Sequence, residues 1–197
     1  MAYDVKDVFY LSTGMTLATG DTGATTAQLD LSAYIDPIAR GRQKGTGLAI
    51  YKVHWDISGA GDGDELVPVA ESGAFKLGLI AGAGFGDNAT GVFAPTGMSQ
   101  SMSVGNALAV YGADWYGPDA MVTAAASNVF GPTGPMNRTF LEPSKEVPYV
   151  VVRDNVCLVT ENLVAMQTTS YVNVRLECAQ ISLDQATLNQ LLRTQTV

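Results

Sequence analysis

Two segments of the chain alternate apolar and polar residues with a period of two. In the segment 47–58 the apolar side chains fall on one face of an extended chain and the polar ones on the other: Tyr51, Val53, Trp55 and Ile57 against Lys52, His54 and Asp56. The segment 171–179 repeats the pattern, with Val172, Val174, Leu176 and Cys178 against Asn173, Arg175 and Glu177. Successive side chains of a strand point to opposite faces, so this pattern predicts half-buried antiparallel strands.

Six further runs are rich in β-branched or aromatic residues and end at Gly, Pro, Asn or Asp: residues 5–11, 28–31, 74–80, 107–111, 149–152 and 156–160. Helical spacing is confined to the C-terminus, where Ser182 and Gln185 fit a capping box ahead of a short helix that ends near Arg193. There is no repeat and no break in composition. The sequence therefore predicts one all-β domain, residues 1–197, a jelly-roll-like antiparallel β-sandwich with a short C-terminal helix.

Three local features refine this prediction. The polar link Arg153–Asn155 favours a tight hairpin between the strands on either side of it. The alternation slips by one residue near Ala179 and Gln180, which indicates a bulge or the strand end. Long loops rich in Gly and Pro are expected at 59–65, 82–100 and 116–148, and in the last of these Phe130, Met136 and Phe140 are candidate contacts to a neighbouring subunit.

Motifs for catalysis, cofactors and metals are weak. His54, the only histidine, stands in a strand without a nucleophile motif and is interpreted as structural. Gly82–Gly86 has the spacing GxGxG and no helix to follow it, so a nucleotide site is not expected. The acidic turn at Asp62, Asp64 and Glu65 lacks a full calcium loop. We expect no enzyme activity, no cofactor, no metal site and no small-molecule substrate.

Charge and cysteine content limit the partners. The net charge is −8, yet Arg40, Arg42 and Lys44 form a local basic segment that is a candidate contact to an internal membrane, the genome or an acidic patch of a neighbouring subunit. No signal peptide or transmembrane segment is evident. Cys157 and Cys178 are expected to be buried thiols, with a cross-strand disulfide as the alternative.

The order of features, with many short strands, few charges, long Gly/Pro/Thr-rich loops and a final region VPYVVVRDNVCLVTEN...TTSYVNVRLECAQISLDQATLNQLL, resembles the single jelly-roll major capsid proteins of tailless icosahedral prokaryotic viruses that enclose a membrane. The resemblance implies a structural virion protein. It would self-assemble into a capsid shell with copies of itself and other capsid proteins. A charged fraction of 15% fits a surface that is largely hidden at interfaces.

A carbohydrate-binding or adhesion β-sandwich is the alternative function. In that case exposed aromatic side chains would stack on sugars, and Trp115, Tyr116 and Phe130 are the candidates.

Overall fold

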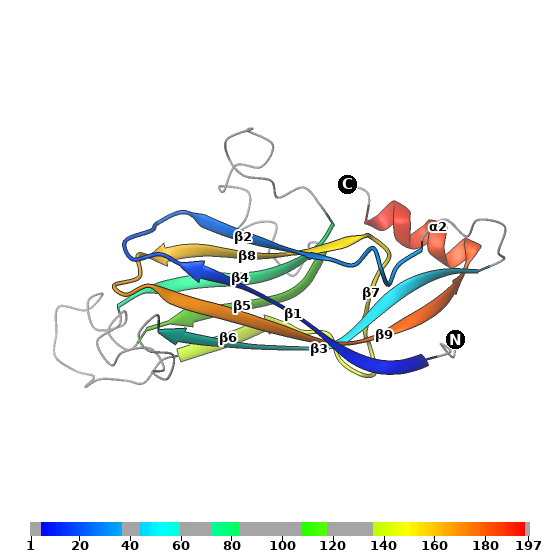
Figure 1. Cartoon of the computed structure of the whole chain (residues 1–197), viewed down its shortest axis with the longest axis horizontal. Coiled ribbons are helices and arrows are strands. Elements are labelled where there is room, and N and C mark those ends of the chain that lie inside the picture. Colours follow the sequence, from blue (N-terminus) through cyan, green and yellow to red (C-terminus); the bar gives the residue numbers. More distant parts are fainter. Residues whose placement is uncertain (1–4, 37–43, 60–71, 83–107, 118–135, 196–197) are drawn as a thin grey trace.

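A computed structural model describes residues 5–36, 44–59, 72–82, 108–117 and 136–195 (Figure 1). All eight segments predicted to be strands contain strands, and the helix at the C-terminus is present. The elements are β1 (Val5–Leu17), β2 (Ala24–Asp30), β3 (Lys44–Gly59), β4 (Ala74–Ala81), β5 (Ala109–Tyr116), β6 (Met136–Leu141), β7 (Tyr149–Val151), β8 (Asn155–Val164), β9 (Ser170–Asp184) and α2 (Gln185–Thr194).

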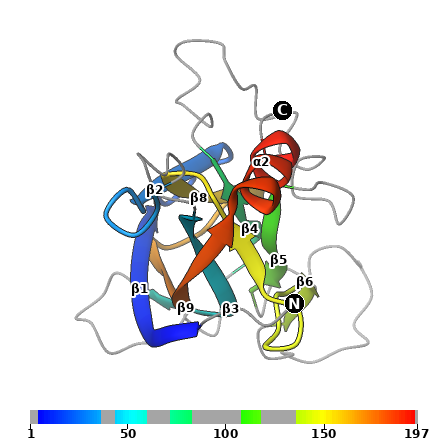
Figure 2. The same ribbon diagram turned by 90° about the vertical axis from the view of Figure 1, so that its right-hand side faces the viewer.

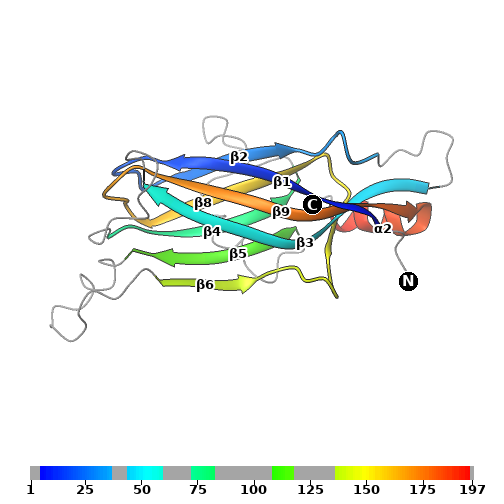
Figure 3. The ribbon, with the colours of Figure 1, turned by 60° about the horizontal axis from the view of Figure 1, so that its bottom comes forward.

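The strands form two antiparallel sheets, of order β1-β9-β3-β7 and β2-β8-β4-β5-β6 (Figures 1 and 3). Their pairings are nested: β1 pairs with β9, β2 with β8, β3 with β7, and β4 with β5. Successive strands from β1 to β4 alternate between the sheets: β1 and β3 lie in the four-stranded sheet, and β2 and β4 lie in the five-stranded sheet. Nested pairs folded over into two sheets are the jelly-roll topology, so the predicted fold is confirmed.

Side chains from both sheets fill the space between them. Figure 2 shows the two layers of ribbon from one end. An aromatic group joins the layers. The Phe75 ring of β4 stacks on Trp115 of β5 with centroids 5.3 Å apart, and meets Trp55 of β3 edge-on at 6.2 Å. Phe75 is completely buried, which makes it the contact between the sheets that is most sensitive to truncation.

The structure corrects the prediction of a loop throughout 116–148, because residues 136–141 form strand β6 at the edge of the five-stranded sheet. Its stability comes from contacts that no local pattern reveals. Arg138 pairs with the buried carboxylate of Asp114 on β5, and the ring of Phe140 covers Gly112 so closely that a Cβ at that glycine would collide with it. The sequence did not predict this strand, because it lies between two prolines, Pro135 and Pro143, and about half of its residues are polar.

The start of the helix is also corrected. Strand β9 continues through Ser182 and Leu183, which pair with Thr46 and Gly45 of β3, so the predicted capping box at Ser182 is not formed. Asp184 is the N-cap, and its carboxylate accepts the N–H of Thr187 at 2.7 Å. That hydrogen bond holds the pKa of Asp184 below its ordinary value.

The predicted slip near Ala179 is confirmed in the burial of β9, where Cys178 and Ala179 are both buried. The strand does not end there, however. The irregularity lies on β3, where Ile50 pairs with Cys178 and Lys52 with Glu177, which leaves Tyr51 as the extra residue. The predicted placement of Tyr51 on the same face as Val53 is therefore wrong: Tyr51 packs with the apolar side chains under α2, on the other face of the sheet.

The predicted hairpin at Arg153–Asn155 is wrong. β7 pairs with β3 in one sheet, whereas β8 pairs with β2 and β4 in the other. The short polar link therefore carries the chain across the sandwich from one sheet to the other. Within the part of the chain that the structure describes, no helix is long and apolar enough to cross a membrane.

Candidate functional site: the outer face and open edge of the four-stranded sheet

The outer face of the four-stranded sheet carries rows of polar side chains from β1, β9 and β3. Cross-strand pairing sets these rows: Tyr10, Glu177 and Lys52; then Ser12, Arg175 and His54; then Gly14, Asn173 and Asp56. The alternation seen in the sequence places them opposite the core-facing apolar residues. Donors and acceptors of several kinds thus lie together on one exposed face.

The second and third rows, together with Tyr10, line a hollow of about 920 Å³. Gly14 contributes to its depth, because a Cβ at this position would lie 3.0 Å from both Asn173 Oδ1 and the carbonyl oxygen of Val172. The Arg175 guanidinium lies 5.8 Å from the centre of the Tyr10 ring, and Tyr10 is 60% exposed. The hollow is therefore polar, open, and bounded on the β1 side by an exposed aromatic ring.

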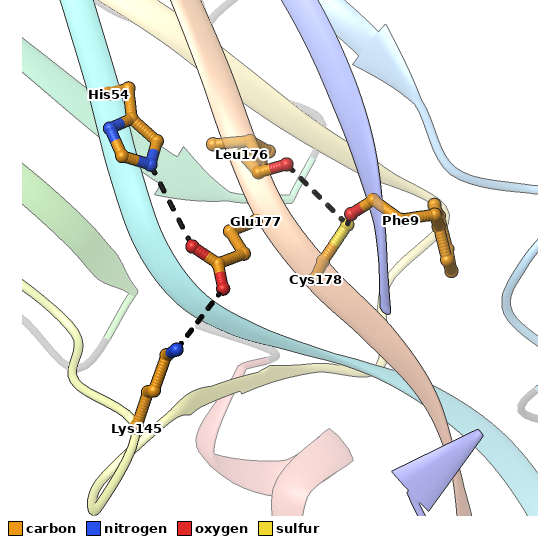
Figure 4. A network of polar contacts seen from close by, with 6 residues as sticks. All are labelled: Phe9, His54, Lys145, Leu176, Glu177 and Cys178. Atoms are coloured by element: carbon orange, nitrogen blue, oxygen red, sulfur yellow. Dashed lines mark hydrogen bonds and ion pairs between the residues drawn. The ribbon is translucent and has the colours of Figure 1, made fainter. Parts of the chain in front are cut away.

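Glu177 joins this face to the segment between β6 and β7 (Figure 4). Its carboxylate lies 3.8 Å from Nε2 of His54 and 3.6 Å from Nζ of Lys145. The side chain of Glu177 is mostly buried, whereas both partners are exposed. Lys145 and Glu177 thus form an ion pair between two elements, and His54 lies beside the same carboxylate. The structural role of His54 stays an interpretation.

The two edges of the four-stranded sheet differ in their protection. β7 is three residues long, and the buried side chain of Gln195 occupies its free edge: Nε2 donates to the carbonyl oxygen of Val150 at 2.7 Å, and Oε1 accepts the N–H of Val152 at 3.2 Å. β1 is thirteen residues long and has β9 on one side only. Among the described residues no backbone hydrogen bond joins β1 to another strand on its free side.

The predicted basic segment lies mostly outside the described residues. Arg40 and Arg42 belong to that part, and Lys44 is exposed at the first position of β3, where it pairs with Asp184 of β9. The positive charge of Lys44 also contributes to the lowered pKa of Asp184. A contact of this segment with anionic groups stays a prediction.

The predicted contact residues of the 116–148 segment fall in two places. Phe130 lies outside the described residues, whereas Met136 and Phe140 belong to β6 instead of a loop. Phe140 is half-buried, and Nζ of Lys76 lies 5.0 Å above its ring. Much of its apolar surface is thus used within its own subunit, and contact with a neighbour stays a prediction.

Of the three aromatic residues predicted to stack on sugars, Phe130 lies outside the described residues, and the other two are not freely exposed. Trp115 is only 2% exposed and belongs to the core, so its proposed role is wrong. Tyr116 at the end of β5 is half-buried. Within the described ranges the exposed aromatic side chains are Tyr10 and Tyr171, both on the outer face of the four-stranded sheet.

The acidic turn and the glycine-rich segment, for which the sequence predicts neither a metal nor a nucleotide site, lie largely beyond the described ranges. Asp62, Asp64 and Glu65 are outside them, as are residues 83–86 of the glycine-rich segment. Gly82 is described, with a φ of 116° and Arg153 packed where a side chain would lie. Among the side chains that the structure describes, no group of three or more His, Cys, Asp or Glu could hold a metal ion.

Both cysteines are buried free thiols, as predicted, and the alternative disulfide is not formed. Cys178 lies in the core between the sheets, and its Sγ donates to the carbonyl oxygen of Phe9 at 3.5 Å. Cys157 lies on the other face of the five-stranded sheet with Ile80 and Val159. Burial raises the pKa of Cys157 to about 11 and that of Cys178 to about 12.

We expect neither thiol to react with an alkylating reagent at pH 8 while the protein is folded. At a pKa of about 11, only roughly one molecule in a thousand carries the reactive thiolate, and no solvent reaches the sulfur. Mass spectrometry should find both sites modified only in denaturant. A Gln190→Cys variant, exposed on α2, is the positive control and should react in the native state; rapid native labelling of Cys157 or Cys178 would contradict the buried placement.

Comparisons with known proteins identify solved structures but no relative in sequence. No family model matches the chain, and no curated protein matches it. The VP1 protein of Trichodysplasia spinulosa-associated polyomavirus, in complex with GM1 oligosaccharide, matches over 92% of this chain and 99% of its own, with 9% identity and a TM-score of 0.42. Merkel cell polyomavirus VP1, in complex with disialyllactose, matches over 92% and 97%, with 10% identity and a TM-score of 0.37.

These structural neighbours are viral capsid proteins with a jelly-roll fold. At TM-scores this low, the fold assignment rests on the nested strand pairing of this chain and not on the likeness. Neither structure comes from the prokaryotic virus group that the sequence texture resembles, so that finer assignment stays a prediction.

Tyr10, Gly14 and Gln195 were not among the site residues predicted from the sequence. For Tyr10 and Gly14 a signal exists, because the alternation with a period of two continues beyond Leu11. Met15 and Leu17 fall on the inward face, and Gly14 falls on the outward face, where it is the one residue without a side chain. Gln195 has no such signal, because a glutamine just after a helix is ordinarily exposed.

Proposed function

We propose that the chain is a structural virion protein that self-assembles into an icosahedral capsid shell. The observation that carries the proposal is the jelly-roll sandwich with one sheet edge covered by Gln195 and the opposite edge, thirteen residues of β1, left open. Monomeric proteins ordinarily blunt such an edge, whereas subunits of a shell use their flanks as interfaces.

Exposed apolar side chains support the same proposal. Val8 and Tyr10 are more than half exposed on β1, Leu163 and Val164 are about half exposed at the end of β8, and Val147 is 74% exposed before β7. They belong to different parts of the chain, namely β1, the end of β8 and the segment before β7. Exposed apolar side chains are typical of surfaces that contact other subunits. Few charged residues compete with these contacts.

In this proposal the partners are other copies of the chain and further capsid proteins, and the protein resides in the virion. The segment with Arg40, Arg42 and Lys44 would meet an internal membrane or the genome. A role in catalysis is not part of the proposal.

The test is the assembly state of the purified full chain. We expect sedimentation velocity across salt and protein concentration to show discrete multimers, and electron microscopy to show closed shells of uniform size. Dilute monomer under every condition would contradict the proposal. The carbohydrate-binding alternative predicts instead a monomer that binds a glycan column. It also predicts that the double variant Asp56→Ala, Asn173→Ala no longer binds. These two residues line the outer-face hollow, where planar polar groups lie beside an exposed tyrosine.

A further inference from the structure

The free edge of β1 lacks the devices that prevent strand addition. Between Val8 and Leu17 it contains no charged residue and no proline. The register with β9 shifts only between Val5 and Val8, so the ladder is regular from Val8 onward. The opposite edge, β7, is short and occupied by Gln195. Within the described part of the chain, ten successive residues of β1 therefore have no strand hydrogen-bonded on this side. Near the start of this edge the Tyr34 ring stacks on Phe9, with the ring centres 5.0 Å apart.

We infer that a second copy of this chain pairs with this edge, β1 against β1 in antiparallel orientation, about a two-fold axis at Ser12. The inference rests on the proposed self-assembly and names one of its interfaces. In a continuous sheet the outward side chains of both copies must share a face, so a residue at the axis faces itself. Centring the pair at Ser12 uses Val8 to Thr16 of both copies, which is nearly the whole regular edge.

The side chains match in this register. Tyr10 comes opposite the partner's Gly14, twice by symmetry. Tyr10 is 60% exposed, with the Arg175 guanidinium 5.8 Å from its ring centre, while Gly14 is kept bare because a Cβ would crowd Asn173 and Val172. An aromatic ring lying across a glycine on the neighbouring strand shields that backbone and is a favourable cross-strand pair. Each ring would rest on the β1 side of the other copy's hollow.

Charge does not oppose this pairing, although each copy carries −8. The carboxylate beside the edge is Glu177, opposite Tyr10 on β9, and it is already engaged by His54 and Lys145. Arg175, opposite Ser12, would lie three strand spacings, about 14 Å, from its equivalent in the second copy. A neutral, self-matching edge of this kind fits a second copy better than a charged peptide.

Disulfide trapping tests both the interface and its register. In full-length Ser12→Cys protein the two sulfurs would face each other across strands whose Cα atoms are about 4.5–5.5 Å apart, which suits a disulfide. We expect mild oxidation to give a covalent dimer, with Cys157 and Cys178 excluded by burial. The matched control is Thr16→Cys on the same exposed face, whose equivalents would lie roughly 27 Å apart and should not be linked. Equal trapping of the two variants, or no trapping of Ser12→Cys, would overturn the inference.

A second experiment blocks the edge without trapping it. Tyr10→Lys combined with Ser12→Lys should abolish concentration-dependent dimerisation in sedimentation, while Thr26→Lys on exposed β2 should not. Circular dichroism verifies that both variants fold. If wild-type shells form and the double variant forms them equally well, the edge pairing is wrong and the capsid proposal stands. If Ser12→Cys is trapped as a dimer but no larger assembly ever forms, the edge pairing stands and the capsid proposal fails.

Discussion

Phe75→Ala will lower the free energy of unfolding by about 3–5 kcal/mol, the cost of removing a large aromatic ring from a close-packed core. Phe75 is fully buried and contacts Trp115 within its own sheet and Trp55 of the opposite sheet. Its removal leaves a cavity between the layers that backbone strands on both sides cannot close. Urea titration followed by tryptophan fluorescence measures the loss, because the protein contains only two tryptophans and both lie against Phe75.

Phe140→Ala is the matched control for this prediction. It deletes the same ring from a half-buried position on the edge strand β6. We expect a distinctly smaller loss of stability, since less apolar area returns to water. Equal losses for the two variants would show that Phe75 does not join the sheets as described.

Gln195→Leu will lower the free energy of unfolding by about 2–4 kcal/mol, although the new side chain is more apolar. The amide of Gln195 satisfies the carbonyl oxygen of Val150 and the N–H of Val152, and leucine would leave both backbone groups without a partner in a largely buried place. Thermal and urea unfolding measure the effect. Gln190→Leu, the same change at an exposed position of α2, is the control and should alter stability by less than about 0.5 kcal/mol.

Gln195→Glu distinguishes the lost hydrogen bonds from the lost shape. At neutral pH the carboxylate has no proton to donate to Val150, so we expect destabilisation comparable to that of the leucine variant. Its folded-state pKa must then exceed the ordinary value near 4.3, and protonation at acidic pH restores the donor. The difference in the free energy of unfolding between wild type and Gln195→Glu should therefore become smaller as the pH falls. A difference that does not change with pH would show that the lost hydrogen bonds do not cause the loss of stability.

The fold could be predicted from the sequence where a strand can be recognised from its local pattern of apolar and polar residues. The alternation in 47–58 and 171–179 places Val53 and Leu176 inward and His54 and Arg175 outward, and the structure agrees. The edge strand β6 has no such local pattern, because its stability depends on contacts with Asp114 and Gly112 of another strand. The helix start moved to Asp184 for the same reason: pairing with Gly45 and Thr46 extends β9 past the local capping signal.

The candidate site was predictable only in part. The outward residues of β3 and β9 were identified, but their neighbours on β1 were not, since β1 and β9 lie more than 150 positions apart in the chain. Likewise the link Arg153–Asn155 looks like a hairpin turn in isolation. Only the competition among strands for partners decides that it crosses between the sheets.

By itself, the sequence determined which side chains of the regular strands face the core, because backbone pleating ties that choice to a period of two and to local composition. Tyr51 is an exception, because the bulge in β3 interrupts the period at that residue. The tertiary structure alone decided which strands are neighbours, which edge Gln195 covers and which edge stays open. Those outcomes depend on hydrogen bonds and packing between distant segments, such as β1 with β9 and Gln195 with β7, and no local pattern encodes them. The open edge of β1, on which self-assembly is proposed to depend, is a consequence of that long-range choice.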